Sequence, residues 1–168
     1  MLSRAVRQDG FGLIELLISM VILNVGLLAL VAAFQSGAFA LQRASKLSSA
    51  AAIADIQMER YRALTYSAIA LDSATLATDQ TDSVYVGDEA FSQSQVTKTC
   101  SGVPDECRPI RTLTGPEGRP YRIDTYIVLD SVSSSRLFKR VTVVVRDAKL
   151  LSGRPLARVE STFDESTG

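Results

Sequence analysis

Three side chains in this sequence have the type and the position to do chemistry: Glu15, Cys100 and Cys107. Glu15 lies at the edge of a long apolar run, where a carboxylate needs a partner because an isolated charge is costly in apolar surroundings. The two thiols enclose the segment SGVPDE, and such a pair can form a disulfide or take part in binding a metal. The chemistry indicated is therefore ion pairing and thiol chemistry.

The composition of the chain argues against an enzyme. It contains no His, and so lacks the usual general base at neutral pH and the commonest metal ligand. It has neither a phosphate-binding glycine loop nor the spacing of a nucleophile elbow. Lys and Arg number 18 and Asp and Glu number 18, so no net charge points to nucleic acid. We expect no catalytic residue, no cofactor and no nucleic-acid partner.

The apolar run decides the class of protein. Leu16–Phe34, about 19 residues, would be ~28 Å long as a helix, which matches a hydrocarbon core of ~30 Å. Arg4 and Arg7 precede the run, so the N-terminus is predicted to be cytoplasmic and the rest of the chain to lie outside. A secretory signal peptide cleaved near the AFA segment 38–40 is the second interpretation, but its apolar region should span only ~7–15 residues.

The segment GFGLIELL, Gly10–Leu17, resembles the type IV prepilin cleavage motif, in which a short basic leader ends in Gly, Phe follows, and Glu is the fifth residue after the cut. The resemblance implies that a membrane-bound prepilin peptidase and methyltransferase removes the leader Met1–Gly10 and methylates the Phe11 amine. It also implies that the Glu15 carboxylate of one subunit pairs with the Phe11 amine of a neighbour, since a paired charge is far less costly than an isolated one.

A single long helix is predicted from about Leu13 to about Leu71. Residues 11–34 would be its transmembrane half, and residues 35–71, which contain no Pro, its amphipathic half. Gly26 and Gly37 fit this helix either as tolerated small residues or as points of close helix packing. Apolar residues at alternating steps of three and four form a stripe on the second half: Leu47, Ala51, Ala54, Met58, Tyr61 and Leu64 or Thr65.

Residues 72–168 are predicted to form an extracytoplasmic β domain. Asp72–Asp82 is predicted to be a loop, with short strands in Ser83–Phe91 and Gln93–Thr99. An antiparallel meander is predicted for three segments that alternate apolar and polar residues: Tyr121–Asp130, Leu137–Asp147 and Leu156–Phe163. The apolar face of that meander needs a cover, which the striped helix supplies. The predicted fold is α+β and pilin-like, with one long N-terminal helix packed on a small antiparallel sheet.

The cysteines lie in the part of the chain predicted to be outside the membrane, where a Cys100–Cys107 disulfide is favoured. A structural zinc site needs closer cysteines and two more ligands, so no metal is expected. The following segment, RPIRTLTGPEGRPYR, holds Arg108, Arg111, Arg119 and Arg122. It is predicted to be a solvated, turn-rich loop in preference to a basic binding surface.

The segment that begins NVGLLAL at Asn24 and runs to about Leu64 is similar to PilV-type minor pilins and to the minor pseudopilin I of type II secretion. This resemblance implies a single-pass protein of the inner membrane that joins other pilin subunits in a filament and helps to prime assembly. The predicted function is that of a minor pilin of a type IV pilus, used in adhesion, motility or DNA uptake. A minor pseudopilin of type II secretion and a membrane-anchored exported binding protein are the alternatives.

Overall fold

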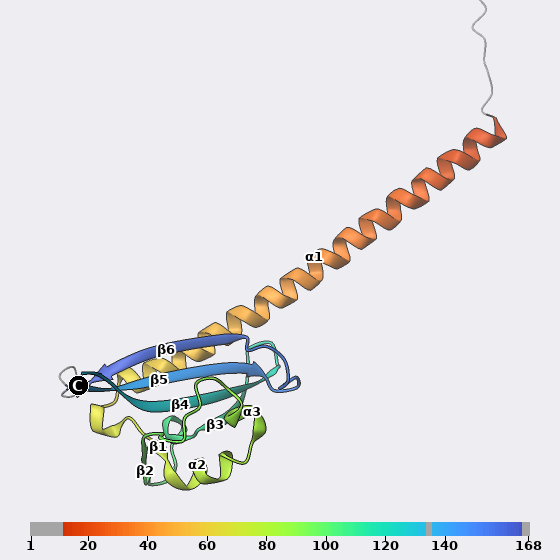
Figure 1. The fold of residues 1–168 in the computed structure, drawn as a ribbon. Coiled ribbons are helices and arrows are strands. Elements are labelled where there is room, and N and C mark those ends of the chain that lie inside the picture. The colour runs from red at the N-terminus through yellow and green to blue at the C-terminus, as the bar shows by residue number, and fades with distance from the viewer. Residues whose placement is uncertain (1–11, 134–135, 166–168) are drawn as a thin grey trace, which may run out of the picture. The chain divides into compact units, whose positions relative to one another are not determined.

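The computed structural model describes residues 12–133 and 136–165 (Figure 1). The chain divides into two compact units, the first ending at Ala44 and the second beginning at Ser45. The helix α1, Leu13–Arg62, supplies residues to both units. In the second unit the end of α1 packs on a four-stranded antiparallel sheet, which confirms the predicted α+β fold.

The helix α1 ends at Arg62, so the prediction that it continues to about Leu71 was wrong. Thr65 has extended backbone angles, with φ −66° and ψ 153°, and is followed by the short 3-10 helix η1, Tyr66–Ala68. Leu71 then begins the two-residue strand β1, Leu71–Asp72, which pairs in parallel with β2, Thr97–Lys98. The composition of this segment favours a helix, but its tertiary contacts hold it in another conformation.

Two lysines fix the segment that follows α1. The ammonium group of Lys139 donates to the carbonyl oxygens of Tyr66 and Ile69, at 2.7 and 2.8 Å. The ammonium group of Lys98 donates to the carbonyl oxygen of Ala68, at 2.7 Å. The two ammonium groups thus supply donors to backbone carbonyl groups in a segment that has left the helix.

The sheet of the second unit has the strand order β3-β4-β5-β6, with every neighbouring pair antiparallel. The three strands predicted from alternation are all present, at slightly different bounds: β4, Pro120–Ser133; β5, Arg136–Asp147; and β6, Ala157–Asp164. The edge strand β3, Ile110–Thr114, was not predicted, because its segment was taken for a solvated loop. Pairing of Arg111 with Ile123 and of Leu113 with Tyr121 places it beside β4.

One face of the sheet is covered by the end of α1. The fully buried side chains of β4 and β5 on this face include Ile123, Ile127, Val141 and Val143. The helix buries Ala50, Ile53, Ala54, Gln57, Met58 and Tyr61. Of the predicted stripe, Ala54, Met58 and Tyr61 are therefore correct, whereas Leu47 and Ala51 are exposed.

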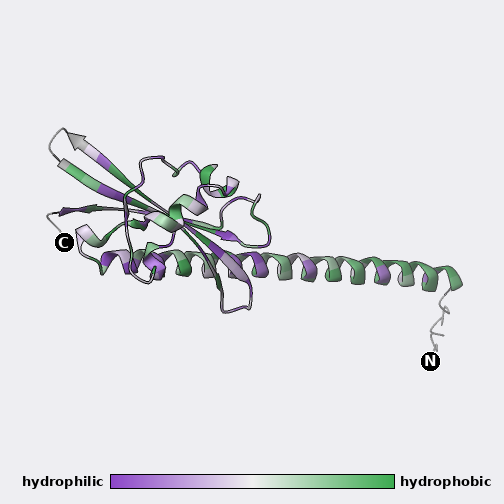
Figure 2. Cartoon of the chain, turned by 90° about the horizontal axis from the view of Figure 1, so that it is seen from below, coloured by the Kyte–Doolittle hydropathy of each residue, from purple (hydrophilic) through white to green (hydrophobic). Residues whose placement is uncertain are grey.

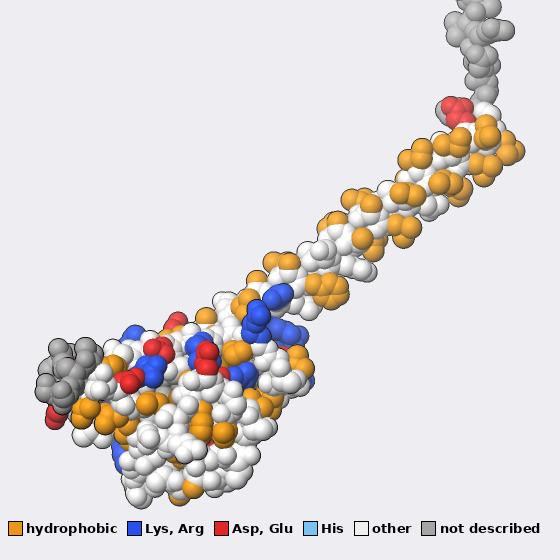
Figure 3. All heavy atoms as spheres, in the orientation of Figure 1, with side chains coloured by type: hydrophobic (Ala, Val, Ile, Leu, Met, Phe, Trp, Pro, Cys, Tyr) orange, Lys and Arg blue, Asp and Glu red, His pale blue; other side chains and the backbone are white. Residues whose placement is uncertain are grey.

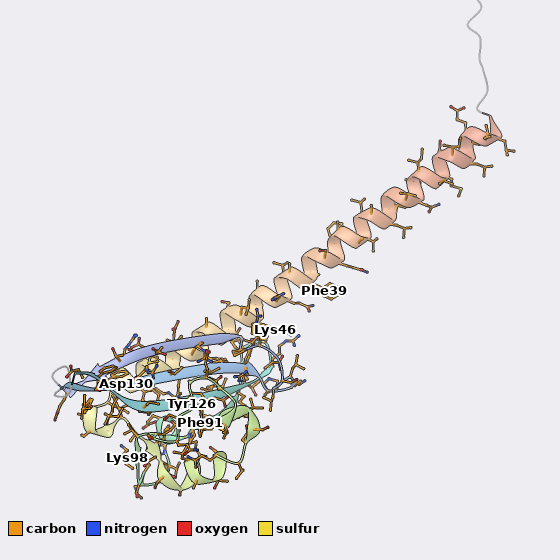
Figure 4. The ribbon with its side chains drawn as sticks, in the orientation of Figure 1. Phe39, Lys46, Phe91, Lys98, Tyr126 and Asp130 are labelled. Carbon is orange, nitrogen blue, oxygen red and sulfur yellow. A yellow bond between two sulfur atoms is a disulfide. The ribbon has the colours of Figure 1, made fainter. Side chains whose placement is uncertain are left out.

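The opposite face of the sheet is also covered, although a cover was predicted for the apolar face alone. The segment predicted to be a loop and a strand forms two short helices, α2, Ser73–Asp79, and α3, Ser83–Val86. The carboxylate of Asp82 caps α3 by accepting from the backbone N–H groups of Val84 and Tyr85, at 3.0 and 2.9 Å. The Tyr85 ring stacks on Tyr126 of β4 with centroids 4.5 Å apart, and Phe91 meets Tyr85 edge to face. Tyr126 and Phe91 are labelled in Figure 4.

Candidate functional site

The carboxylate of Glu15 lies in the first turn of α1. Backbone N–H groups of Glu15 and Leu16 donate to the carbonyl oxygen of Gly12, at 3.0 and 3.3 Å, and the Ser19 hydroxyl donates to the carbonyl oxygen of Glu15 at 2.8 Å. The Glu15 side chain is exposed, and within the part of the chain that the structure describes its carboxylate has no hydrogen bond and no ion pair. The helix dipole favours a negative charge here, but the carboxylate remains open to an outside partner. Gly10 and Phe11 lie outside the described residues.

The surface of α1 is predominantly apolar over residues 16–34. Figure 2 shows hydrophobic residues over most of this stretch, and Figure 3 shows their side chains along the visible face. Large side chains such as Leu13, Leu28 and Phe34 are 70–78% exposed in the single chain. Among the described residues, α1 is the helix that is long and apolar enough to cross a membrane. Such a surface needs lipid or other helices as cover.

Two glycines of α1 are open to a neighbour. A Cβ atom added at Gly26 or at Gly37 would meet no atom within 4 Å. Around Gly37 the helix surface is slightly hollowed, and the hollow is lined by Leu30, Ala33, Phe34, Gly37, Ala38 and Leu41. Nothing within the single chain requires a glycine at either position, so both are available for close approach by another helix.

The cysteines form the predicted disulfide, Cys100–Cys107. The loop that it closes is held at several points. The backbone N–H of Cys100 donates to the Asp72 carboxylate at 3.0 Å, and this hydrogen bond, followed by that from the Thr75 N–H, lowers the pKa of Asp72. The Tyr61 hydroxyl at the end of α1 donates to the carbonyl oxygen of Glu106. The disulfide therefore closes a loop that is anchored both to β1 and to the helix.

A set of buried charges holds α3 and the segment that follows it on the sheet. The Arg122 guanidinium donates to the Asp82 carboxylate at 2.8 and 2.9 Å and, through Nε, to Asp124 at 2.6 Å. The hydrogen bond from Arg122 lowers the pKa of Asp82 to about 2, although burial of the carboxylate opposes the shift. Burial raises the pKa of Asp124, whose side chain is fully buried.

The buried charges continue from β4 to β5 and β6. Arg146 donates to Asp88 at 2.5 Å, and its Nε lies 3.4 Å from the second carboxylate oxygen of Asp124. Arg158 of β6 donates to both oxygens of Asp88, at 2.8 and 3.0 Å. Charges of opposite sign thus alternate from Asp82 to Arg158. Asp82 was predicted to lie in a loop and Asp88 and Asp124 in strands, and no role was predicted for their carboxylates. The signal missed in the sequence was the N-cap pattern of Asp82 followed by Ser83.

The arginines predicted to lie in a solvated loop have separate positions. Arg111 is in β3, where it donates to the Gln57 side chain at 3.2 Å and lies 3.2 Å from Asp105. Arg122 belongs to the buried charges of β4, whereas Arg108 and Arg119 are exposed. The prediction of one turn-rich loop was therefore wrong, because Ile110–Thr114 pairs with β4.

The comparisons with known proteins concern the N-terminal segment. The family described as "Prokaryotic N-terminal methylation motif" matches residues 6–31. This range includes Gly10, Phe11 and Glu15 and runs into the apolar part of α1. No curated protein and no solved structure matches the chain.

Proposed function

We propose that this chain, whose methylation motif at residues 6–31 supports a type IV pilin-like protein, is a minor pilin, a structural subunit of a type IV pilus. The observation that carries the proposal is the continuity of the motif with α1, whose apolar surface lacks a cover in the single chain. The similarity of the segment from Asn24 to Leu64 to minor pilins supports the choice of subunit.

The N-terminal residues have distinct roles in this proposal. A prepilin peptidase cuts between Gly10 and Phe11, releases the leader Met1–Gly10 and methylates the Phe11 amine. Before assembly, residues 11–34 cross the inner membrane with the N-terminus in the cytoplasm. The segment 35–71 and the domain 72–168 then lie outside, where the disulfide is favoured. In the filament the apolar surface of α1 is covered by the helices of other pilin subunits.

Glu15 is the proposed assembly contact. Its exposed carboxylate has no partner among the described residues, and an unpaired carboxylate is costly once it is surrounded by apolar helices. The amine of Phe11 in a neighbouring subunit would neutralise it. Since both charges are unfavourable alone, their pairing favours one axial stagger between subunits.

The test is the variant Glu15→Gln, which keeps the shape of the side chain and removes its charge. We expect membrane insertion to be unchanged, because removal of a charge lowers the cost of insertion. Recovery of the tagged protein in sheared filaments should fall at least about tenfold, as for loss of ~1.4 kcal/mol of assembly free energy. Ser19→Ala, one turn further along α1, is the matched control. Equal recovery of Glu15→Gln and wild type would refute the charge pair.

A second measurement tests processing. Mass spectrometry of the mature N-terminus should find a methylated Phe11, and an intact Met1 or a start near Leu41 would contradict the proposal. The competing function, a minor pseudopilin of type II secretion, predicts that deletion of the gene abolishes protein secretion while pili remain. A membrane-anchored binding protein without a filament predicts that Glu15 is dispensable.

A further inference from the structure

We infer that the groove between the end of α1 and the edge strand β3 binds an extended segment of a partner protein that carries an acidic and an aliphatic side chain two residues apart. The groove has a volume of about 370 Å³. Its floor is apolar, with Ile53 and Ile123, and two arginines, Arg60 and Arg111, lie at its rim. None of these residues lies in the matched segment 6–31, so the inference does not rest on the proposed filament role.

Within the part of the chain that the structure describes, the strand β3 has backbone groups at Thr112 and Thr114 that are open to such a segment. The N–H of Thr125 donates to the carbonyl oxygen of Pro109, and the N–H of Gly115 donates to that of Arg119. Hydrogen-bonded pairs alternate along an antiparallel ladder, so Arg111 and Leu113 are the residues bonded to β4. The backbone groups of Thr112 and Thr114 therefore point away from the sheet. An added strand would bond to these two residues, as in other cases of strand addition to a sheet edge.

The groove can take an apolar side chain. Ile56 of α1 lines it and is 59% exposed, so apolar surface of its side chain is open to a ligand in the groove. Leu113 is half-buried on the opposite wall. An aliphatic side chain placed between Ile56 and Leu113 would remove apolar surface from water on both walls and so favour binding.

The positive charge of Arg60 and Arg111 at the rim of the groove favours an acidic residue in the bound segment. Arg60 and Arg111 both contact one oxygen of Asp105, each at 3.2 Å. Two guanidinium groups thus share one carboxylate, which leaves an excess positive charge. Burial lowers the pKa of Arg111, and the nearby charge of Arg60 adds to this effect. Arg111 and Leu113 lie on the same face of β3, two residues apart. A partner strand with an acidic residue opposite Arg111 would therefore place the residue two positions along opposite Leu113.

The occupant is a different protein and not a second copy of the described chain. The other edge strand, β6, would be the natural donor in a self-association. Its apolar side chains, Val159 and Phe163, already pack against the core of their own domain. They cannot enter the groove of another copy without leaving that core, whereas a free extended segment has no such cost.

The experiment measures binding of the labelled, end-blocked peptide TTDTLTT to the full chain in detergent micelles by fluorescence anisotropy. In this peptide the Asp and Leu side chains lie on the same face of an extended strand. The control peptide TTDLTTT has the same composition, but the two side chains lie on opposite faces. We expect saturable binding of the first peptide and at least about tenfold weaker binding of the second, as for loss of one buried aliphatic contact.

Matched variants locate the site. Ile56→Gln should weaken binding about tenfold, and Arg60→Gln about two- to fivefold because an exposed ion pair contributes less. The controls are Leu47→Gln and Arg62→Gln, which change exposed residues of α1 outside the groove lining and should alter affinity less than twofold. Equal affinity for the two peptides, absence of saturable binding, or equal effects of the controls would overturn the inference. Concentration-dependent self-association that Ile56→Gln abolishes would also overturn it, in favour of a second copy.

Discussion

The hydroxyl of Tyr61, in the last turn of α1, donates a hydrogen bond to the carbonyl oxygen of Glu106 inside the disulfide-closed loop. Burial raises the pKa of Tyr61 to about 12, so the phenol is a neutral donor at physiological pH. The bond joins residues 45 positions apart in the sequence. It fixes the rotation of the helix end relative to the loop, and thereby the face of α1 that meets the sheet.

Removal of this hydroxyl should destabilise the domain. Tyr61→Phe keeps the ring in the core but leaves the Glu106 carbonyl without its donor, so the free energy of unfolding should fall by about 1–2 kcal/mol. Chemical denaturation followed by tyrosine fluorescence measures the change. Tyr66→Phe is the control, because the described contacts of Tyr66 involve its carbonyl group and ring.

The same variant also tests whether the disulfide positions the loop. In the background Cys100→Ser the carbonyl of Glu106 is less restrained, so Tyr61→Phe should cost less than it does in the oxidised protein. An equal cost in both backgrounds would show that the hydrogen bond forms without help from the disulfide.

The ion pairs of Asp82 predict a dependence of stability on pH. Its pKa is about 2, below the ordinary value of 3.8, so the folded state binds this proton less readily than the unfolded chain. The resulting stabilisation is fully present above the ordinary pKa and is lost as the pH falls from about 4 towards 2. Asp82→Asn should lower the free energy of unfolding at pH 7 by about 1–2 kcal/mol, a value reduced for the partial exposure of Asp82. It should also flatten the acid dependence.

Denaturation at a series of pH values checks this prediction. Asp55→Asn, on the exposed face of α1, makes the same chemical change where no ion pair exists among the described residues. It should leave the acid dependence as in wild type. An Asp82→Asn protein with the full acid dependence would show that other carboxylates control it.

Gly37 tests the packing of the apolar part of α1. Gly37→Leu adds a side chain where the single chain has open space, and replacing Gly by Leu favours the helix by somewhat under ~1 kcal/mol. The unassembled protein should therefore be as stable as wild type or more so. Recovery in sheared filaments should fall if a neighbouring helix approaches there. Ala33→Leu tests another small residue of the same hollow, whereas Leu23→Ile controls for changes in the lipid-facing surface.

The strands β4, β5 and β6 could be predicted because one face of each is largely apolar and meets the core. On β5 this face carries Val141, Val143 and Val145, and all three are fully buried. The disulfide followed from the position of the two cysteines. In these cases the local pattern and the tertiary structure require the same conformation.

The covered second face could not be predicted in this way. On this face, polar residues alternate with the apolar residues of the inner face: Arg122 and Asp124 in β4 and Arg146 in β5. Such a pattern indicates a solvated face. Burial of these polar residues depends on carboxylates from Asp82 and Asp88, which are distant in the sequence. Likewise β3 has Arg111 on the face that meets α1, where Gln57 and Asp105 contact the guanidinium. Partners of this kind are set by the fold and leave no periodic signal.

The last prediction concerns which part of α1 the sheet needs. A fragment beginning at Gln35, or at Ser45 where the second compact unit starts, should be a soluble monomer, because it retains the buried helix residues Ile53, Met58 and Tyr61. A fragment beginning at Asp72 should aggregate. It lacks the helix that covers Ile123, Ile127 and Val143, and an exposed apolar sheet face with open edges associates readily. Size-exclusion chromatography and the cooperativity of unfolding distinguish the two outcomes.

A point substitution in the longer fragment should reproduce the loss of the helix. Met58→Asp places an unpaired charge at a side chain that is 1% exposed, which destabilises the domain by several kcal/mol. Ile56→Asp makes the same change two residues away, where the side chain is 59% exposed, and should leave the fragment folded. If the fragment from Asp72 unfolds cooperatively as a monomer, the sheet has its core elsewhere. The packing of α1 on β4 and β5 would then not be what stabilises this domain.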